Sequence, residues 1–203
     1  MPQLVIIRHG QSTFNLENRF TGEMDVPLTA LGREEAARAG KLVKQAHIVF
    51  DRAFTSVLMR AHQTLEIVLA ELGQQALAVE QSKALNERNY GNLQGLNKAE
   101  VALQYGEDQV ALWRRSFAVR PPGGESLHDT VNRVVPYYAQ HIEPLLRLNK
   151  NILIVAHGNS LRALMMHVEQ LTEETILHTE IATGAPRLYQ FDVTMKIEVI
   201  KNL

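Results

Sequence analysis

The sequence contains no cysteine, few aromatic residues (6%) and no long apolar run. The lack of cysteine excludes disulfides, thiolate metal ligands and a cysteine nucleophile. The amino terminus, MPQLVIIRHG, has a short apolar segment and no basic leader, which is typical of neither a secretion signal nor a membrane span. We therefore expect a cytoplasmic protein.

Neither sign of charge is in excess. There are 21 Lys and Arg residues against 22 Asp and Glu, for a formal net charge of -1. This balance gives no chain-wide attraction for nucleic acid or anionic lipid, so we expect neither as a partner and look for a local anion site. With 203 residues, 45% of them hydrophobic, the chain can bury the core of one compact domain. We expect residues 1–203 to form a single domain.

Two short apolar runs, 4–7 and 152–155, do not alternate with polar residues. Such runs are typical of strands buried on both faces of a parallel sheet, and we expect both to be central. Apolar stripes of helical period lie between and after them, and the last twenty residues predict a hairpin around Thr194. Strands that alternate with helices predict an α/β fold, a three-layer sandwich with a mostly parallel central sheet flanked by helices.

Four helices are predicted from these stripes and from their end signals. Ser and Thr residues are favoured N-caps, and glycine commonly ends a helix. Proline inside a helix removes a hydrogen bond and bends it. The predicted features are a helix capped by Thr29, a helix from N-cap Ser56 to Gly73, a helix after the capping box Ser126 to Asp129 with a bend at Pro136, and a helix after the 152–155 strand that reaches Val168.

Both apolar runs lead into a histidine followed by a glycine. The first gives Arg8-His9-Gly10 and the second gives His157-Gly158. Each histidine alone is explained as well by a structural role, in which it hydrogen-bonds a carbonyl at a strand end. Because ligands bind beyond the carboxyl ends of strands in such sheets, the matching placement of the two histidines favours a shared site.

We interpret His9 as a nucleophile toward phosphorus. A neutral imidazole is nucleophilic at pH 7, and its attack on a phosphoryl group gives a phosphohistidine. Arg8 and further arginines would lower the pKa of the ring and donate hydrogen bonds to the phosphoryl oxygens. Arg60, in the first turn of the predicted Ser56 helix, is a candidate for this role, although its position fits a solvated surface arginine equally well.

Arg114 and Arg115 are adjacent, and adjacent helical residues point about 100° apart. Both therefore reach one ligand only if the helix ends there or the ligand carries two anionic groups, which suggests a two-anion substrate. Backbone N–H groups at Gly10, at Gly22, at Gly158 and at the helix that starts at Asn159 could also donate to a phosphate.

Protonation of a leaving group needs an acid. Glu87 is our candidate because it lies in ALNERNYGNLQG, a polar stretch without helical or strand period; a surface-loop role is the alternative. His157 could donate the proton instead, or bind the phosphoryl oxygens. No His-Glu-x-x-His, EF-hand or Walker pattern occurs, and we expect no metal.

Several motifs together resemble a known family, the histidine phosphatase superfamily, and within it the 2,3-bisphosphoglycerate-dependent phosphoglycerate mutases. The resemblance runs in order from about residue 4 to 162. Its more specific signals are the NERNYGNLQGLNKAE block and the Arg114-Arg115 pair. The matching stretches are LVIIRHGQSTFN, FTGEMDVPLT, TSVLMRAHQT, ALNERNYGNLQGLNKAE, WRRSF, PPGGESLHDT and VAHGNSLRAL.

The resemblance implies roles for individual residues. It makes His9 the phosphorylated nucleophile, Glu87 the general acid and base, and Arg8, Arg60 and His157 the phosphate pocket. The remaining residues that it places on the substrate's phosphates and carboxylate are Asn15, Thr21, Gly22, Tyr90, Lys98, Arg114, Arg115, Gly158 and Asn159.

The reaction implied by the resemblance is a ping-pong transfer that interconverts 3-phosphoglycerate and 2-phosphoglycerate, in glycolysis and gluconeogenesis. His9 is primed by 2,3-bisphosphoglycerate, without a metal. A broad phosphomonoesterase and a non-catalytic phospho-ligand module are the alternatives; neither needs both Glu87 and the Arg114-Arg115 pair. A homodimer is left open, because the 117–124 loop is shorter than in many members of the family.

Overall fold

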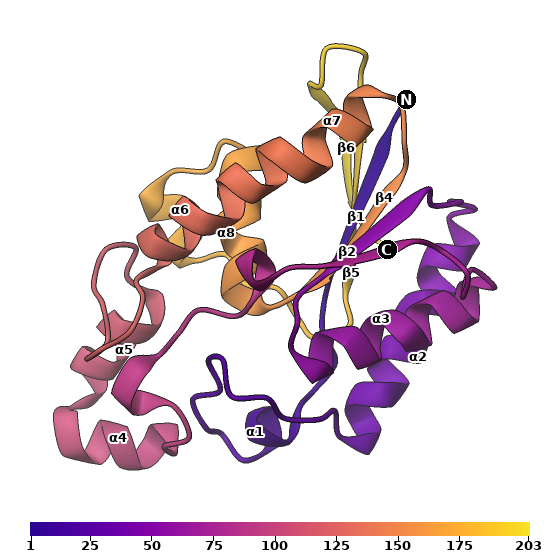
Figure 1. Ribbon diagram of the computed structural model, residues 1–203. Helices are drawn as coiled ribbons and strands as arrows, with labels where there is room; N and C mark the ends of the chain where they lie inside the picture. Colours follow the sequence, from indigo (N-terminus) through magenta and orange to yellow (C-terminus); the bar gives the residue numbers. More distant parts are fainter.

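The computed structural model describes residues 1–203 and contains one six-stranded sheet (Figure 1). The strand order is β3-β2-β4-β1-β5-β6. Strands β3, β2, β4 and β1 pair in parallel, whereas β5 is antiparallel to both β1 and β6. The strands are β1 (Gln3–Arg8), β2 (Arg52–Thr55), β3 (Val79–Gln81), β4 (Ile152–Ala156), β5 (Pro186–Phe191) and β6 (Ile197–Asn202).

Helices cover both faces of the sheet (Figure 1), with α2 and α3 on one face and α6, α7 and α8 on the other. The predicted three-layer α/β sandwich is therefore confirmed, as are the central position of β1 and β4 and the carboxyl-terminal hairpin. The helices are α1 (Thr13–Leu16), α2 (Ala30–Gln45), α3 (Met59–Leu72), α4 (Lys98–Tyr105), α5 (Glu107–Arg115), α6 (Leu127–Tyr137), α7 (Glu143–Arg147), α8 (Gly158–Val168) and α9 (Glu173–Leu177), with short 3-10 turns at Lys83–Leu85 and Gly91–Leu93.

The apolar run of β1 is continuous because both of its faces are covered. Leu4 and Ile6 join the larger core cluster beneath α6 and α8, and Val5 and Ile7 join the cluster beneath α2 and α3. Burying each of these side chains stabilises the fold by roughly 1.5 to 3 kcal/mol. The two central strands thus form a rigid base for the loops at their carboxyl ends.

Most of the predicted helix ends are confirmed. Thr29 caps α2 through its side chain, Ser126 and Asp129 form a capping box on α6, and Gly73 ends α3 with a φ of 72°. Pro136 lies inside α6, and the helix continues after it as a π-helical segment, Tyr138–Ile142.

The predicted N-cap at Ser56 is wrong. Helix α3 begins three residues later, at Met59, whose backbone N–H donates to Asp25 Oδ1 at 2.6 Å. The Ser56 hydroxyl instead accepts a bond from the backbone N–H of Leu58 and contacts His157 Nε2. Because the Ser56 hydroxyl bonds to Leu58 N–H and to His157, it does not cap α3.

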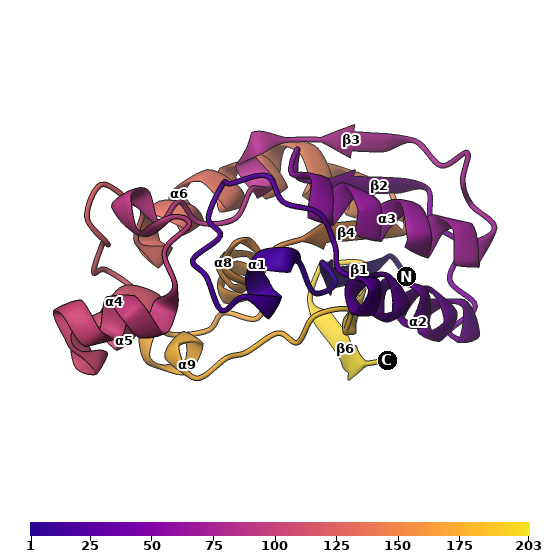
Figure 2. The same cartoon turned by 90° about the horizontal axis from the view of Figure 1, so that it is seen from below.

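Helices α4 and α5 lie beyond the end of the sheet, beside the loops at the carboxyl ends of the strands (Figure 2). A small apolar cluster anchors them there, since Val101 and Val110 pack against Phe20, Leu93 and Trp113. This hairpin carries Lys98 at its start and the two adjacent arginines at its end. None of the helices combines the length and apolar character that crossing a bilayer requires.

Candidate active site

The two histidines at the carboxyl ends of β1 and β4 lie next to each other. Arg8 pairs with Ala156 in the sheet register, and the backbone N–H of His9 donates to the Ala156 carbonyl at 2.9 Å. The ring centroids of His9 and His157 are 5.0 Å apart, and their exposed fractions are 3% and 0%. The sheet register therefore brings the two histidines to one place, as the sequence predicts.

The ring of His9 is held in one orientation. Its Nδ1 lies 2.7 Å from the Gly10 carbonyl oxygen, which only accepts, so Nδ1 carries the proton. Nε2 then presents its lone pair, and Arg60 Nε donates to it at 3.3 Å. Burial, followed by the charges of Arg60 and Arg8, holds the pKa of His9 well below 6.5. The ring is therefore neutral at pH 7, with Nε2 as its nucleophilic atom.

Arg60 is fully buried and forms the floor of the site with His9. Besides its bond to the ring, it donates through Nη1 to the Met24 carbonyl and through Nη2 to the Gly22 carbonyl, at 2.9 and 2.8 Å. Burial lowers its pKa to about 10, so it remains charged at neutral pH. The surface-arginine interpretation of this residue is wrong, because the loop after α1 closes over its guanidinium.

His157 contacts Ser56 through one ring nitrogen. The hydroxyl oxygen of Ser56 accepts from the Leu58 N–H at 3.2 Å and lies 2.7 Å from His157 Nε2. The other ring nitrogen, Nδ1, is buried and has no hydrogen-bond partner in the protein. Burial is the largest cause that holds the pKa of His157 well below 6.5. The ring is therefore neutral at pH 7, and its Nδ1 is not bonded to any other part of the protein.

Glu87 lies at the N-terminus of α8. Its Oε1 accepts the backbone N–H groups of Arg88, at 2.7 Å, and of Asn159, at 3.1 Å. These two bonds fix the carboxylate in a chain segment without regular secondary structure. The other oxygen, Oε2, makes no hydrogen bond to the protein and lies near Arg8 and Gly158. It is therefore free to exchange a proton with a ligand.

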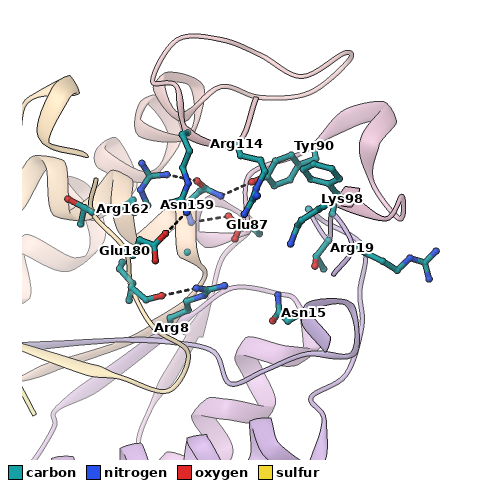
Figure 3. Close-up of a pocket in the computed structure, with 17 residues that line it drawn as sticks. Arg8, Asn15, Arg19, Glu87, Tyr90, Lys98, Arg114, Asn159, Arg162 and Glu180 are labelled. Atoms are coloured by element: carbon teal, nitrogen blue, oxygen red, sulfur yellow. Dashed lines mark hydrogen bonds and ion pairs between the residues drawn. The ribbon is translucent and has the colours of Figure 1, made fainter. Parts of the chain in front are cut away.

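Glu87 lines a polar cavity of about 260 Å³, together with Arg8 and Gly158, the chain neighbours of the two histidines (Figure 3). Cations dominate its wall, and only two carboxylates, of Glu87 and Glu180, face them. An anionic ligand is therefore favoured. The lining residues are Arg8, Asn15, Arg19, Phe20, Thr21, Gly22, Glu87, Tyr90, Lys98, Arg114, Arg115, Gly158, Asn159, Arg162, Thr179, Glu180 and Ile181.

Several donors in this wall have no protein partner. The Nε groups of Arg8 and Arg162 are buried without a hydrogen bond. Arg162 otherwise donates to Asn159 Oδ1 at 3.1 Å, and burial lowers its pKa to about 10. Burial, together with the charges of Arg114 and Arg8, lowers the pKa of Lys98 to about 8. Because an unpaired buried donor costs free energy, these groups fit a ligand that brings several acceptor oxygens.

The structure brings all of the predicted site residues together. His9, Arg60 and His157 are buried and are not themselves among the residues that line the cavity, whereas all the other predicted residues line it, including Arg8 next to His9 and Gly158 next to His157. Arg114 and Arg115 are the last two residues of α5, so the predicted condition that the helix ends at the pair is met. The Gly10 N–H is not available to a ligand, because it donates to Thr64 Oγ1.

Sequence reasoning missed part of the wall. Arg162 follows Asn159 by three positions on α8. This spacing places both residues on one face of the helix, so Arg162 could have been predicted as a site residue from the sequence. The residues from the segment between α9 and β5 had no such signal, because no local pattern shows that this segment returns to the cavity. The missed residues are Arg19, Phe20, Arg162, Thr179, Glu180 and Ile181. No group of His, Cys, Asp or Glu side chains is arranged to hold a metal ion.

Comparison with known proteins agrees with this geometry. A chain from Cytophaga hutchinsonii, described as a 2,3-bisphosphoglycerate-dependent phosphoglycerate mutase, is 56% identical over 203 residues, which are all of this chain and 94% of the relative. A protein of the same description from Methylocella silvestris is 54% identical over 96% of this chain and 95% of the relative.

Solved structures share the fold at lower identity. Bacillus stearothermophilus YhfR superposes with a TM-score of 0.84 at 24% identity, over 98% of this chain and 95% of that one. A mycobacterial glucosyl-3-phosphoglycerate phosphatase in complex with VO3 gives 0.81 at 25% identity, over 100% and 97%. The family model described as histidine phosphatase superfamily (branch 1) matches residues 4–195. With the paired histidines and the cationic cavity in place, the chain belongs to branch 1 of the histidine phosphatase superfamily.

Proposed function

We propose that this protein interconverts 3-phosphoglycerate and 2-phosphoglycerate as a 2,3-bisphosphoglycerate-dependent mutase. Relatives of that description match nearly the whole chain at more than 50% identity. The observation that carries the proposal is the second cationic group in the cavity, formed by Lys98, Arg114 and Arg115, in addition to Arg8, which directly precedes His9. An enzyme that hydrolyses phosphate monoesters needs only the donors that bind the reacting phosphate. An enzyme that binds a phosphoglycerate also needs cations for the second anionic group.

The nucleophile in this proposal is His9 Nε2. The Gly10 carbonyl holds the proton on Nδ1, and burial beside Arg60 and Arg8 keeps the ring neutral. The bond from Arg60 Nε to Nε2 gives way when the ring attacks phosphorus, and the guanidinium then donates to a phosphoryl oxygen. Such preorganised donors stabilise the charge of the transition state.

The phosphoryl oxygens also need donors that are not already used. Arg8 Nε and His157 Nδ1 are buried and have no protein partner, and in this proposal the neutral His157 ring carries its proton on Nδ1. We assign His157 to phosphate binding rather than to proton transfer, because Ser56 occupies its Nε2 and burial keeps the ring neutral. At an effective dielectric near 20, an arginine beside a phosphate oxygen contributes roughly 4 kcal/mol before desolvation is subtracted.

Glu87 is the proton carrier. Its Oε1 is held by two backbone N–H groups, and its Oε2 faces the cavity. When phospho-His9 passes its group to the free hydroxyl of a phosphoglycerate, Oε2 accepts the hydroxyl proton. The carboxyl group returns that proton to the oxygen that leaves in the reverse transfer. A positioned acid and base of this kind contributes about 10²- to 10⁴-fold to the rate.

The cofactor 2,3-bisphosphoglycerate, when bound, supplies the phosphoryl group that primes His9. The donor set fits a ligand with three anionic groups, because the buried unpaired N–H of Arg162 adds to the cations from α4 and α5. Lys98 and Tyr90 face the cavity from one side and Asn159 and Arg162 from the other in Figure 3. A three-carbon acid bound between them can present either its carbon-2 oxygen or its carbon-3 oxygen to His9.

The test supplies 3-phosphoglycerate with a trace of 2,3-bisphosphoglycerate and a metal chelator, and measures 2-phosphoglycerate and inorganic phosphate together. We expect 2-phosphoglycerate to form in large excess over phosphate. Phosphate as the main product would support a phosphomonoesterase and contradict the proposal. Formation of neither product would support a binding module.

A further inference from the structure

Glu180 is the one acidic side chain among the ligand-binding cations that the proposed mechanism does not use. It lies between α9 and β5, lines the cavity and forms an ion pair with Arg115. In Figure 3 it approaches the cavity from the side of Arg8 and Arg162, across from Lys98. A carboxylate at this place opposes the binding of an anion, and the fold does not require it there.

The pairing of Glu180 is selective. Glu180 is the only hydrogen-bond partner of the Arg115 side chain, whereas Lys98 and Arg114 have no acidic partner. The hydrogen bond from Arg115, then its charge, and at longer range the charges of Arg8 and Arg114 lower the pKa of the Glu180 carboxyl. The same cations that would hold the ligand thus hold this carboxylate.

The backbone beside Glu180 is anchored while its side chain is free to move. Arg8 Nη1 donates to the carbonyl of buried Ile181 at 2.7 Å, which fixes the segment at the cavity. The side chain of Glu180 is 69% exposed and makes no other hydrogen bond. A carboxylate on a fixed backbone with no packing of its own can leave its partner at little cost.

We propose that Glu180 is a specificity-determining residue, whose carboxylate occupies Arg115 until the second anionic group of a two-anion ligand displaces it. A ligand that carries only a phosphate engages the histidine floor and leaves the Glu180 to Arg115 pair in place. The inference rests on the proposed function, since it takes Arg115 as part of the second-anion site. Exposed pairs of this kind shift an equilibrium by up to about fivefold, so the cost to the correct ligand is modest.

The test compares ligand binding by calorimetry in the full-length wild type and in Glu180→Gln. We expect Glu180→Gln to bind 3-phosphoglycerate about threefold to fivefold more tightly, because the competing carboxylate is gone. Binding of glycerol 3-phosphate, which has no carboxylate, should change by less than about twofold on the same reasoning. Glu174→Gln is the matched control: it removes the same charge from exposed α9 outside the cavity and should leave both affinities unchanged.

The same Glu180→Gln substitution, made in an Arg115→Gln variant, shows whether Glu180 acts through Arg115. In Arg115→Gln protein, Glu180→Gln should give no further gain for 3-phosphoglycerate; a gain that persists would overturn the inference. Unchanged or weaker 3-phosphoglycerate binding by Glu180→Gln alone, or an equal gain for glycerol 3-phosphate, would also overturn it. Wild-type protein that binds 3-phosphoglycerate no more tightly than glycerol 3-phosphate would contradict the second-anion site itself, and the inference with it.

Discussion

Lys98 gives the activity a pH dependence on the alkaline side. Burial, reinforced by the charges of Arg114 and Arg8, lowers the pKa of its ammonium group to about 8. The ammonium form loses its proton as the pH rises through that value, and the neutral amine no longer attracts an anion. Ligand phosphates have a second pKa near 6, so they are about 90% doubly ionised at pH 7 and gain only about a tenth of a charge up to pH 9, which would strengthen binding rather than weaken it.

The size of the effect is set by that pKa. A group with a pKa of about 8 is about 90% protonated at pH 7 and about 10% protonated at pH 9. If the substrate binds only the ammonium form, KM rises about tenfold over these two pH units, with most of the rise above pH 8. The turnover number should change less, because the pKa of the nucleophile His9 lies well below this range and its ring stays neutral.

The assay measures KM and kcat for 3-phosphoglycerate from pH 7 to pH 9 in wild type and in Lys98→Arg. A guanidinium stays charged throughout this range, so Lys98→Arg should keep a nearly constant KM even if its value at pH 7 is higher. A flat wild-type KM up to pH 9 would refute the reasoning. The same rise in Lys98→Arg would move the titrating group elsewhere.

Three further predictions concern the floor of the site and its packing. Glu87→Gln keeps an oxygen for the two backbone N–H groups but cannot carry a proton, so kcat should fall by about 100-fold or more with an unchanged melting temperature; near-normal turnover would exclude Glu87 as the acid. His9 and His157 bind protons in the unfolded chain near pH 6.5 but not in the folded one. The free energy of unfolding should therefore decrease as the pH falls below 6.5, by up to about 1.4 kcal/mol per unit for each ring, and denaturant titrations that agree at pH 7 and pH 5.5 would contradict this. Gly10→Ala places a Cβ 2.1 Å from the Gly32 carbonyl oxygen, so it should destabilise the protein by roughly 1 to 3 kcal/mol, measured in the same titrations.

The sequence alone was sufficient for the central sheet and for the pairing of the two histidines. The continuous apolar runs of β1 and β4 can only be buried on both faces, and two such strands in parallel bring the residues after their carboxyl ends to one edge of the sheet. His9 and His157 therefore meet for a reason that can be read from local pattern. The capping box at Ser126 and the glycine at the end of α3 were predictable for the same reason, because their signals are local.

Other features depend on contacts that local pattern does not encode. Ser56 has the chemistry of an N-cap, and only the three-dimensional structure shows that its hydroxyl serves His157 instead. Glu180 and Ile181 reach the cavity because the chain turns back between α9 and β5, and no periodicity marks that return. The role of Lys98 came from the family resemblance, and the structure adds the burial that lowers its pKa.

The most direct test of the central claim is to identify the residue that carries the phosphoryl group. Protein incubated with radioactive 2,3-bisphosphoglycerate is digested under alkaline conditions, in which phosphohistidine survives, and the labelled peptide is sequenced. We expect label on His9, attached at Nε2, and none in His9→Ala. Label retained at the wild-type level in His9→Ala, or found on His157, would contradict it.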